Sequence, residues 1–177
     1  MKILLPLAEG FEEIEAFAVV DILRRAGIKV DLVGVVGTVI KSARGVSVMA
    51  DKRLAEINPE EYDGIVLPGG NPGYINLGKT QKILEIIKNF NEKGKLIAAI
   101  CASPSILAKA GVLDDKVATI YPGMEKELPH PREGRVIVDK NVITSQAPGT
   151  AIEFALKIVE VLVGKDKALQ LKRDLVV

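Results

Sequence analysis

The chain has 177 residues, of which 48% are hydrophobic, so it can bury one substantial core, and its length does not require a second domain. The 24 Lys and Arg residues balance 23 Asp and Glu residues, a net charge of +1, and these charges are spread along the chain, which argues against a nucleic-acid partner. The single cysteine excludes an internal disulfide, no apolar stretch approaches the roughly 20 residues of a membrane span, and the chain begins without a signal-peptide pattern, so we expect a soluble cytoplasmic protein.

The first half of the chain alternates short apolar runs with stretches of helical spacing. The runs predict strands, and the helical stretches end at glycines, which are typical residues just past a helix C-terminus. The expected elements are, in order, a strand at 2–7, a helix at 11–27, a strand at 29–34, a hairpin at a sheet edge at 38–51, a strand at 63–70 and a capped helix at 80–94.

The second half continues the alternation. The expected elements are a strand at 95–100, a short helix at 103–111, a strand at 116–120, a second hairpin at 135–145, a helix at 149–164 and a helical turn or two in the tail at 165–177. Strands that alternate with crossover helices predict a mostly parallel sheet covered on both faces, as in flavodoxin-like or Rossmann-like sandwiches. Ligands of such folds bind outside the carboxyl ends of the strands, where Cys101 and the pair Gly69 and Gly70 are expected.

The only cysteine, Cys101, lies where a strand is expected to turn directly into a helix. A nucleophile elbow needs small residues two positions before and after the nucleophile, and Ala99 and Ser103 provide them, while Pro104 suits the first helical position. A helix N-terminus favours an anion, so this geometry predicts a thiolate with a pKa below the ordinary value of about 8.5. The alternative is that Cys101 is a small buried hydrophobe.

The expected helix at 11–27 begins with three acids. On a helical wheel Glu15 lies in the middle of the apolar face, between Ile22 and Ala26, whereas Glu13 falls on the polar side and Glu12 at the border. A buried carboxyl group needs a hydrogen-bond partner, and burial raises its pKa, so Glu15 is expected to carry a proton and to donate a hydrogen bond to the Cys101 thiolate or to an oxidised form of that sulfur. A carboxyl group bonded to a backbone amide is the alternative.

The segment "LPGGNPGY" at 67–74 places glycines at the end of a strand. Such glycines let backbone amides point into a pocket and stabilise an oxyanion, although glycine pairs more often just make turns. The segment lacks the lysine of a phosphate-binding loop, and the N-terminal "LAEGFEE" lacks the spaced glycines of a dinucleotide site. Nucleotide binding is therefore disfavoured.

Five motifs in this order resemble the ThiJ/PfpI superfamily, and within it the DJ-1 (Parkinson's disease protein) branch. They are "GFEEIE", "DILRRAGIKV", "YDGIVLPGGN", "KGKLIAAICASPSILA" and "SQAPGTAIEFALKIVEVLVGK". The resemblance covers nearly the whole chain. It implies a single domain over residues 1–177, related to class I glutamine amidotransferases, with a flavodoxin-like three-layer fold and a homodimeric assembly.

The resemblance also implies a site. Cys101 matches the family's nucleophile or redox-sensing cysteine, and Glu15 matches its partner acid. The other matching positions are Gly69, Gly70 and Ala102, whose amides line the pocket, and Arg44 near the subunit interface. Family members are associated with glyoxalase and deglycase activity, with oxidative-stress protection through a cysteine sulfinate and with chaperone-like behaviour, and no metal or organic cofactor is expected.

Two departures from the family pattern affect this expectation. Tyr121 stands where the branch commonly has a histidine, and it completes the predicted catalytic set with Cys101 and Glu15. Tyrosine is a poor base at neutral pH, and His130 from a later loop is a candidate replacement, although a solvent-exposed histidine is the simpler interpretation. Ser103 stands where glycine is usual, which either tightens the elbow or caps the helix.

Two functional hypotheses from different classes follow. In the first, Cys101 attacks methylglyoxal or releases a glyoxal-derived adduct from a thiol or amine. In the second, Cys101 is a peroxide sensor in a chaperone-like dimer, which needs hydrogen-bond donors but no base. A cysteine peptidase is remote, because Ala102 occupies the position of the histidine in the intracellular-protease branch.

Overall fold

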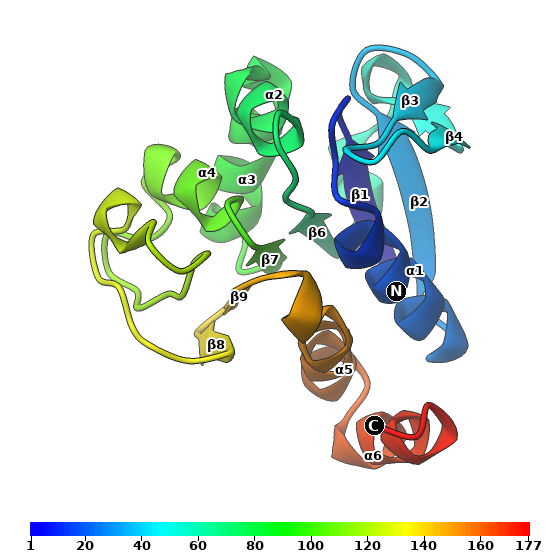
Figure 1. Ribbon diagram of the computed structural model, residues 1–177, viewed down its shortest axis with the longest axis vertical. Coiled ribbons are helices and arrows are strands. Elements are labelled where there is room, and N and C mark those ends of the chain that lie inside the picture. The colour runs from blue at the N-terminus through cyan, green and yellow to red at the C-terminus, as the bar shows by residue number, and fades with distance from the viewer.

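A seven-stranded sheet forms the centre of the molecule in the computed structural model, which describes residues 1–177 (Figure 1). Across the sheet the strands are β5 (Lys52–Arg53), β2 (Lys29–Gly34), β1 (Lys2–Leu7), β6 (Gly64–Leu67), β7 (Leu96–Ile100), β9 (Val142–Ser145) and β8 (Val136–Asp139). All neighbours are parallel except β8 and β9. The predicted flavodoxin-like α/β sandwich with a mostly parallel sheet is confirmed.

Helices cover both faces of this sheet (Figure 1). One face carries α1 (Glu13–Arg25) and α5 (Ala151–Leu162), and α6 (Lys165–Asp174) packs against α5. The other face carries α2 (Gly73–Lys79), α3 (Gln81–Glu92) and α4 (Pro104–Lys109). None of these helices combines the length and the apolar character that crossing a membrane would require.

The central strands are apolar because both of their faces are covered. All four residues of β6 and all five of β7 are buried, and in β1 only Lys2 is not. Because β6 lies between β1 and β7, the loop after β6 separates the start of α1 from the start of α4. The sheet order therefore brings the ends of three strands together at one edge, which is where the sequence placed the acid, the glycine pair and the cysteine.

The hairpin at 38–51 differs from its prediction. Strands β3 (Val39–Lys41) and β4 (Ser47–Met49) pair only with each other, as a separate two-stranded sheet, and β5 forms the edge of the main sheet. The chain turns away sharply after β2, where a Cβ atom added at Gly34 would lie 1.8 Å from the Gly37 carbonyl oxygen. The hairpin consequently leaves the sheet edge, and its backbone hydrogen bonds instead join it to the loop before α1.

The strand predicted at 116–120 is absent, apart from one isolated bridge between Ala118 and Pro131. The amides of Val117 and Thr119 bond to side chains instead of a strand, since they donate to Asp139 Oδ2 and Thr144 Oγ1 at 2.8 and 2.9 Å. An apolar pattern cannot reveal such side-chain acceptors. The sequence also missed α2, whose glycine and proline neighbours suggested a loop.

Candidate active site

Cys101 joins β7 to α4 at a sharp elbow. Its φ of +64° lies in the left-handed region, which residues other than glycine rarely adopt. The Cys101 amide donates to the Ser145 carbonyl at 3.0 Å, and its carbonyl accepts from the Tyr121 amide at 2.9 Å, so neighbouring segments hold the strained residue in place. Ala99 and Ser103, at the two flanking positions, are fully buried, and the predicted nucleophile elbow is confirmed.

Ser103 binds the elbow to the neighbouring strand. Its hydroxyl donates to the Pro68 carbonyl at 2.6 Å, directly after β6, and makes no cap hydrogen bond to α4. Of the two roles that the sequence left open, the structure shows the tightening of the elbow. The bond connects the end of β6 with the elbow after β7, the two segments that flank the site.

We expect Ser103→Ala to lower the free energy of unfolding by about 1–3 kcal/mol, because the buried Pro68 carbonyl loses its donor. Urea unfolding monitored by circular dichroism measures this loss. Ser105→Ala is the matched control, since that hydroxyl bonds a carbonyl of its own turn in a partly exposed place, and we expect a loss below about 1 kcal/mol. Equal losses in the two variants would contradict the assignment.

Glu15 lies in the first turn of α1 and is 1% exposed, as the helical wheel predicted. Its Oε2 accepts from the Gly69 amide at 2.7 Å, and its Oε1 is buried with no hydrogen-bond partner. The Cys101 thiol lies next to this carboxyl group and influences its pKa. The structure therefore shows the bond to a backbone amide that the sequence left as an alternative, with the cysteine beside the acid.

Gly69 lies close to both the Glu15 carboxyl group and the Cys101 side chain. A Cβ atom added there would lie 2.7 Å from both Cys101 Cβ and Glu15 Oε2, so no larger residue fits. Its amide, however, is occupied by Glu15 and is not free for an oxyanion, which corrects the sequence prediction. The amides of Gly70 and Ala102 bond to no other protein group and lie toward the sulfur, as predicted.

Burial dominates the electrostatics of this pair. It raises the pKa of Glu15 from 4.5 to about 7, and the nearby Glu12 carboxylate acts in the same direction. Burial, and then the negative charge of Glu15, also raise the pKa of the Cys101 thiol to about 12, against the amides of Ala102 and Gly70. The predicted lowering of the thiol pKa is therefore wrong, since α4 has only six residues and burial outweighs its N-terminus.

The two groups influence each other in opposite directions. The negative charge of Glu15 helps to raise the pKa of the Cys101 thiol, whereas the thiol, as a hydrogen-bond donor, acts to lower the pKa of Glu15. When Glu15 is ionised, it therefore favours the neutral thiol. When Glu15 holds the proton, the charge that opposes the thiolate is gone, and the carboxyl O–H can donate a hydrogen bond to the sulfur.

A pocket of about 560 Å³ opens over Cys101. The residues that line it are Glu12, Glu15, Ala43, Arg44, Gly70, Asn71, Tyr74, Cys101, Ala102, Tyr121, Met124 and Pro148. They come from the first turn of α1 and the residue before it, the turn of the β3–β4 hairpin, the loop after β6, the first turn of α2, the elbow after β7 and later loops. No group of three or more His, Cys, Asp or Glu residues lies in an arrangement that could hold a metal ion.

The geometry of an acid beside a strained cysteine agrees with the comparison to known proteins. Residues 1–161 match the model described as the DJ-1/PfpI family. The chain belongs to the DJ-1/PfpI family.

Its relatives cover nearly all of the chain. Protein dj-1beta of Drosophila melanogaster is 42% identical over 176 residues, 97% of this chain and 94% of that protein. A Caenorhabditis elegans relative named glutathione-independent glyoxalase DJR-1.2 is 38% identical over 98% of this chain and 94% of its own length. The structure of oxidized Toxoplasma gondii DJ-1 superposes with a TM-score of 0.96 at 41% identity, covering 99% of this chain and 97% of that one.

The departures from the family pattern are visible in the pocket. Tyr121 lines it and is 45% exposed, next to the elbow that its amide holds. His130 does not line the pocket, because its Nε2 lies 2.9 Å from the Asp114 carbonyl oxygen on another part of the surface. His130 is exposed, so the simpler interpretation of a solvent-exposed histidine is confirmed, and the pocket contains no imidazole with which a Cys-His peptidase could be assembled.

The sequence missed the role of Glu13, which the wheel placed on the polar side. Glu13 Oε1 accepts from the Ser42 hydroxyl at 2.5 Å and from the Arg44 amide at 2.9 Å. The hydroxyl and amide hydrogens place a positive potential on this carboxylate, so its pKa is lowered even though partial burial acts to raise it. Glu13 therefore fixes the turn of the β3–β4 hairpin that carries Arg44, which lines the pocket.

Proposed function

We propose that this protein is a cofactor-independent glyoxalase or deglycase that acts on methylglyoxal or on its adducts. The observation that carries the proposal is the contact between the thiol of Cys101 and the buried carboxyl group of Glu15, beside two unoccupied amides. A nucleophile next to an acid that titrates near neutral pH suits addition to a carbonyl group. The relative named glutathione-independent glyoxalase supports this reaction class.

In the proposed reaction the Cys101 thiol passes its proton to the Glu15 carboxylate, and the sulfur attacks the aldehyde carbon of methylglyoxal. A C–S bond forms, and the carbonyl electron pair moves to the oxygen, which the amides of Gly70 and Ala102 stabilise. Glu15 gives its proton to this oxygen, and a hemithioacetal results. The Glu15 carboxylate is then placed to move a proton from the first carbon to the second, which converts the hemithioacetal into a lactoyl thioester.

Hydrolysis completes the cycle. Water attacks the thioester, the C–S bond breaks, and lactate leaves while the Cys101 thiol recovers its proton. The net reaction adds water to methylglyoxal and needs no oxidant or reductant. An adduct on a thiol or amine enters the same sequence after its carrier departs with a proton. Tyr121, at the edge of the pocket, is the proposed hydrogen-bond donor to the second carbonyl group, a role that needs no basic side chain.

The test is lactate formation by the purified protein from methylglyoxal, without added thiol or metal, followed with a stereospecific lactate dehydrogenase. We expect D-lactate to accumulate in proportion to protein concentration. Absence of turnover across about pH 6 to 9, a range that spans the titration of Glu15, would overturn the proposal.

A second candidate function is peroxide sensing. A structural relative with TM-score 0.96 was solved as an oxidized DJ-1, and here the protonated Glu15 and the two amides are donors for the oxygens of a sulfinate. Mass spectrometry after mild peroxide treatment should find two added oxygen atoms on Cys101 and no more. Conversion straight to the sulfonic acid, or no oxidation, would count against it.

The proposed assembly is a homodimer in the reducing cytoplasm. The β3–β4 hairpin and α1 expose several large apolar side chains close to Arg44, and exposed patches of this kind mark interfaces. The exposed fractions are 57% for Ile14, 65% for Val39, 50% for Val46 and 74% for Met49. Sedimentation velocity should find a species of twice the 19.0 kDa chain mass, and a monomer at micromolar concentration would contradict the assembly.

A further inference from the structure

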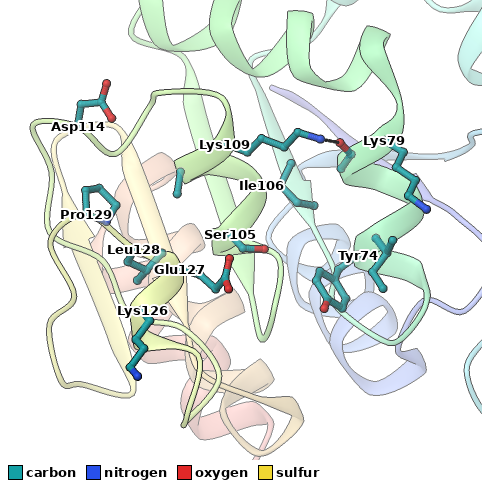
Figure 2. A pocket seen from close by; sticks show the side chains of 13 residues that line it. Tyr74, Lys79, Ser105, Ile106, Lys109, Asp114, Lys126, Glu127, Leu128 and Pro129 are labelled. Atoms are coloured by element: carbon teal, nitrogen blue, oxygen red, sulfur yellow. Dashed lines mark hydrogen bonds between the residues drawn. The ribbon is translucent and has the colours of Figure 1, made fainter.

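A second cavity, drawn in Figure 2, shares Tyr74 with the Cys101 pocket. It is an open groove of about 670 Å³ between α2, α4 and the turn η3 (Glu125–Glu127). Tyr74 lines both cavities, and Ser105 of α4, which lines the groove, is three residues after Ala102 of the pocket. The groove therefore extends the active-site pocket along α4, with Tyr74 at the junction.

The groove carries charges that the protein itself does not neutralise. Lys79, Lys109 and Lys126 line it, and none has a carboxylate within 4.0 Å. Figure 2 shows Lys109 reaching across to α2, where its Nζ donates to the Gly78 carbonyl at 2.7 Å. Asp114 and Glu127, on the opposite wall, also lack a cationic partner.

Apolar side chains form the floor between these charges. Ile106 is 2% exposed and Leu128 is 7% exposed, and both line the groove together with the ring of Tyr74. The groove thus combines an apolar floor with ammonium groups and carboxylates on its rim. This combination fits a short peptide, whose carboxylates, amino group and side chains need all three kinds of contact.

We propose that the groove binds the peptide arm of a methylglyoxal adduct, a short peptide rich in carboxylates whose modified thiol or amine enters the Cys101 pocket past Tyr74. The inference rests on the proposed function and names its substrate class. Methylglyoxal is much smaller than the pocket over Cys101 alone, whereas the two cavities together have the size of sites that bind larger ligands. The three lysines select carboxylates, and the two acids accommodate the peptide's amino group.

Binding to the Cys101→Ala protein tests the groove without turnover. The probe is a fluorescent peptide in which aspartates flank an S-lactoyl cysteine, the stable isomer of the methylglyoxal hemithioacetal. We expect Lys79→Glu/Lys126→Glu to weaken its binding at least about fivefold, measured by fluorescence anisotropy. The matched control, Lys165→Glu/Lys172→Glu on α6, changes the net charge equally and should alter binding less than about twofold.

Equal weakening by the two double variants would show attraction to net charge only and would overturn the inference. So would equal binding of a peptide with lysines in place of the aspartates.

In proteins that retain Cys101, Lys79→Glu/Lys126→Glu should leave turnover of free methylglyoxal within about twofold and lower kcat/KM for the thiol-peptide adduct at least about fivefold. If neither substrate turns over while the binding difference persists, the proposed function fails and the groove stands.

Discussion

We expect Cys101→Ala to eliminate lactate formation from methylglyoxal, with a loss in kcat of at least about 1,000-fold, the scale on which removal of a covalent nucleophile acts. Without the sulfur no C–S bond forms, so no oxyanion develops that could receive the proton of Glu15. The reaction then depends on water alone. Stopped assays of D-lactate against protein concentration measure the loss.

Cys101→Ser is the matched variant, because serine keeps the shape of the side chain and one hydrogen-bonding atom. We expect it to be as inactive as the alanine variant, since a hydroxyl is far less acidic than a thiol and the pocket contains no histidine to activate it. Thermal melts establish that both variants fold. Retention of more than about a tenth of wild-type turnover in either folded variant would contradict the covalent mechanism.

Glu15→Gln separates turnover from thiol reactivity. We expect kcat to fall about 100-fold or more, because glutamine can accept from the Gly69 amide but cannot carry a proton. The rate of Cys101 alkylation should rise at the same time, since the carboxylate charge that helps to raise the thiol pKa to about 12 is removed. Iodoacetamide labelling across pH measures the second effect, and a fall in both rates would indicate a damaged site instead of a lost proton carrier.

The same variant has a pH-dependent effect on stability, whose sign follows from the raised pKa. In the unfolded chain Glu15 ionises at about 4.5, and in the folded protein only at about 7. The contribution of Glu15 to the free energy of unfolding is thus fully present below pH 4.5. It decreases as the pH rises toward 7, by about 3 kcal/mol in total. Glutamine has no such titration, so the variant should gain stability relative to wild type over this range in urea unfolding, and a constant difference between about pH 4 and 8 would contradict the burial argument.

Local spacing was enough to predict the two reactive groups. Ala99 and Ser103 flank Cys101 at the positions that a nucleophile elbow requires, and Glu15 occupies the apolar face of its helix. Each pattern lies within a short stretch of chain. The local geometry of a strand, a turn or a helix is therefore enough to determine which side chains share a face. For the same reason most strands and helices were predicted within a few residues of their observed bounds.

Contacts between distant segments were not predictable in this way. The Gly69 amide bonds Glu15 across 54 positions, and the Ser103 hydroxyl bonds Pro68 across 35. The helical wheel placed Glu13 on the polar side of its helix, although in the structure its carboxylate binds the turn of the β3–β4 hairpin. The spacing of these residues does not indicate a partner. The residues after β6 come next to α1 and to the elbow after β7 only because β6 lies between β1 and β7 in the folded sheet.

The chain's own residues thus indicated its class of fold and its candidate nucleophile and acid, since these depend on local patterns along the chain. Only the tertiary structure decided the direction of the Cys101 pKa, the loss of the Gly69 amide as an oxyanion donor, and the groove that continues the pocket past Tyr74. The physical reason is that desolvation, hydrogen-bond partners and cavities are properties of the space between elements. That space is defined by packing, which the order of residues along one strand or helix does not describe.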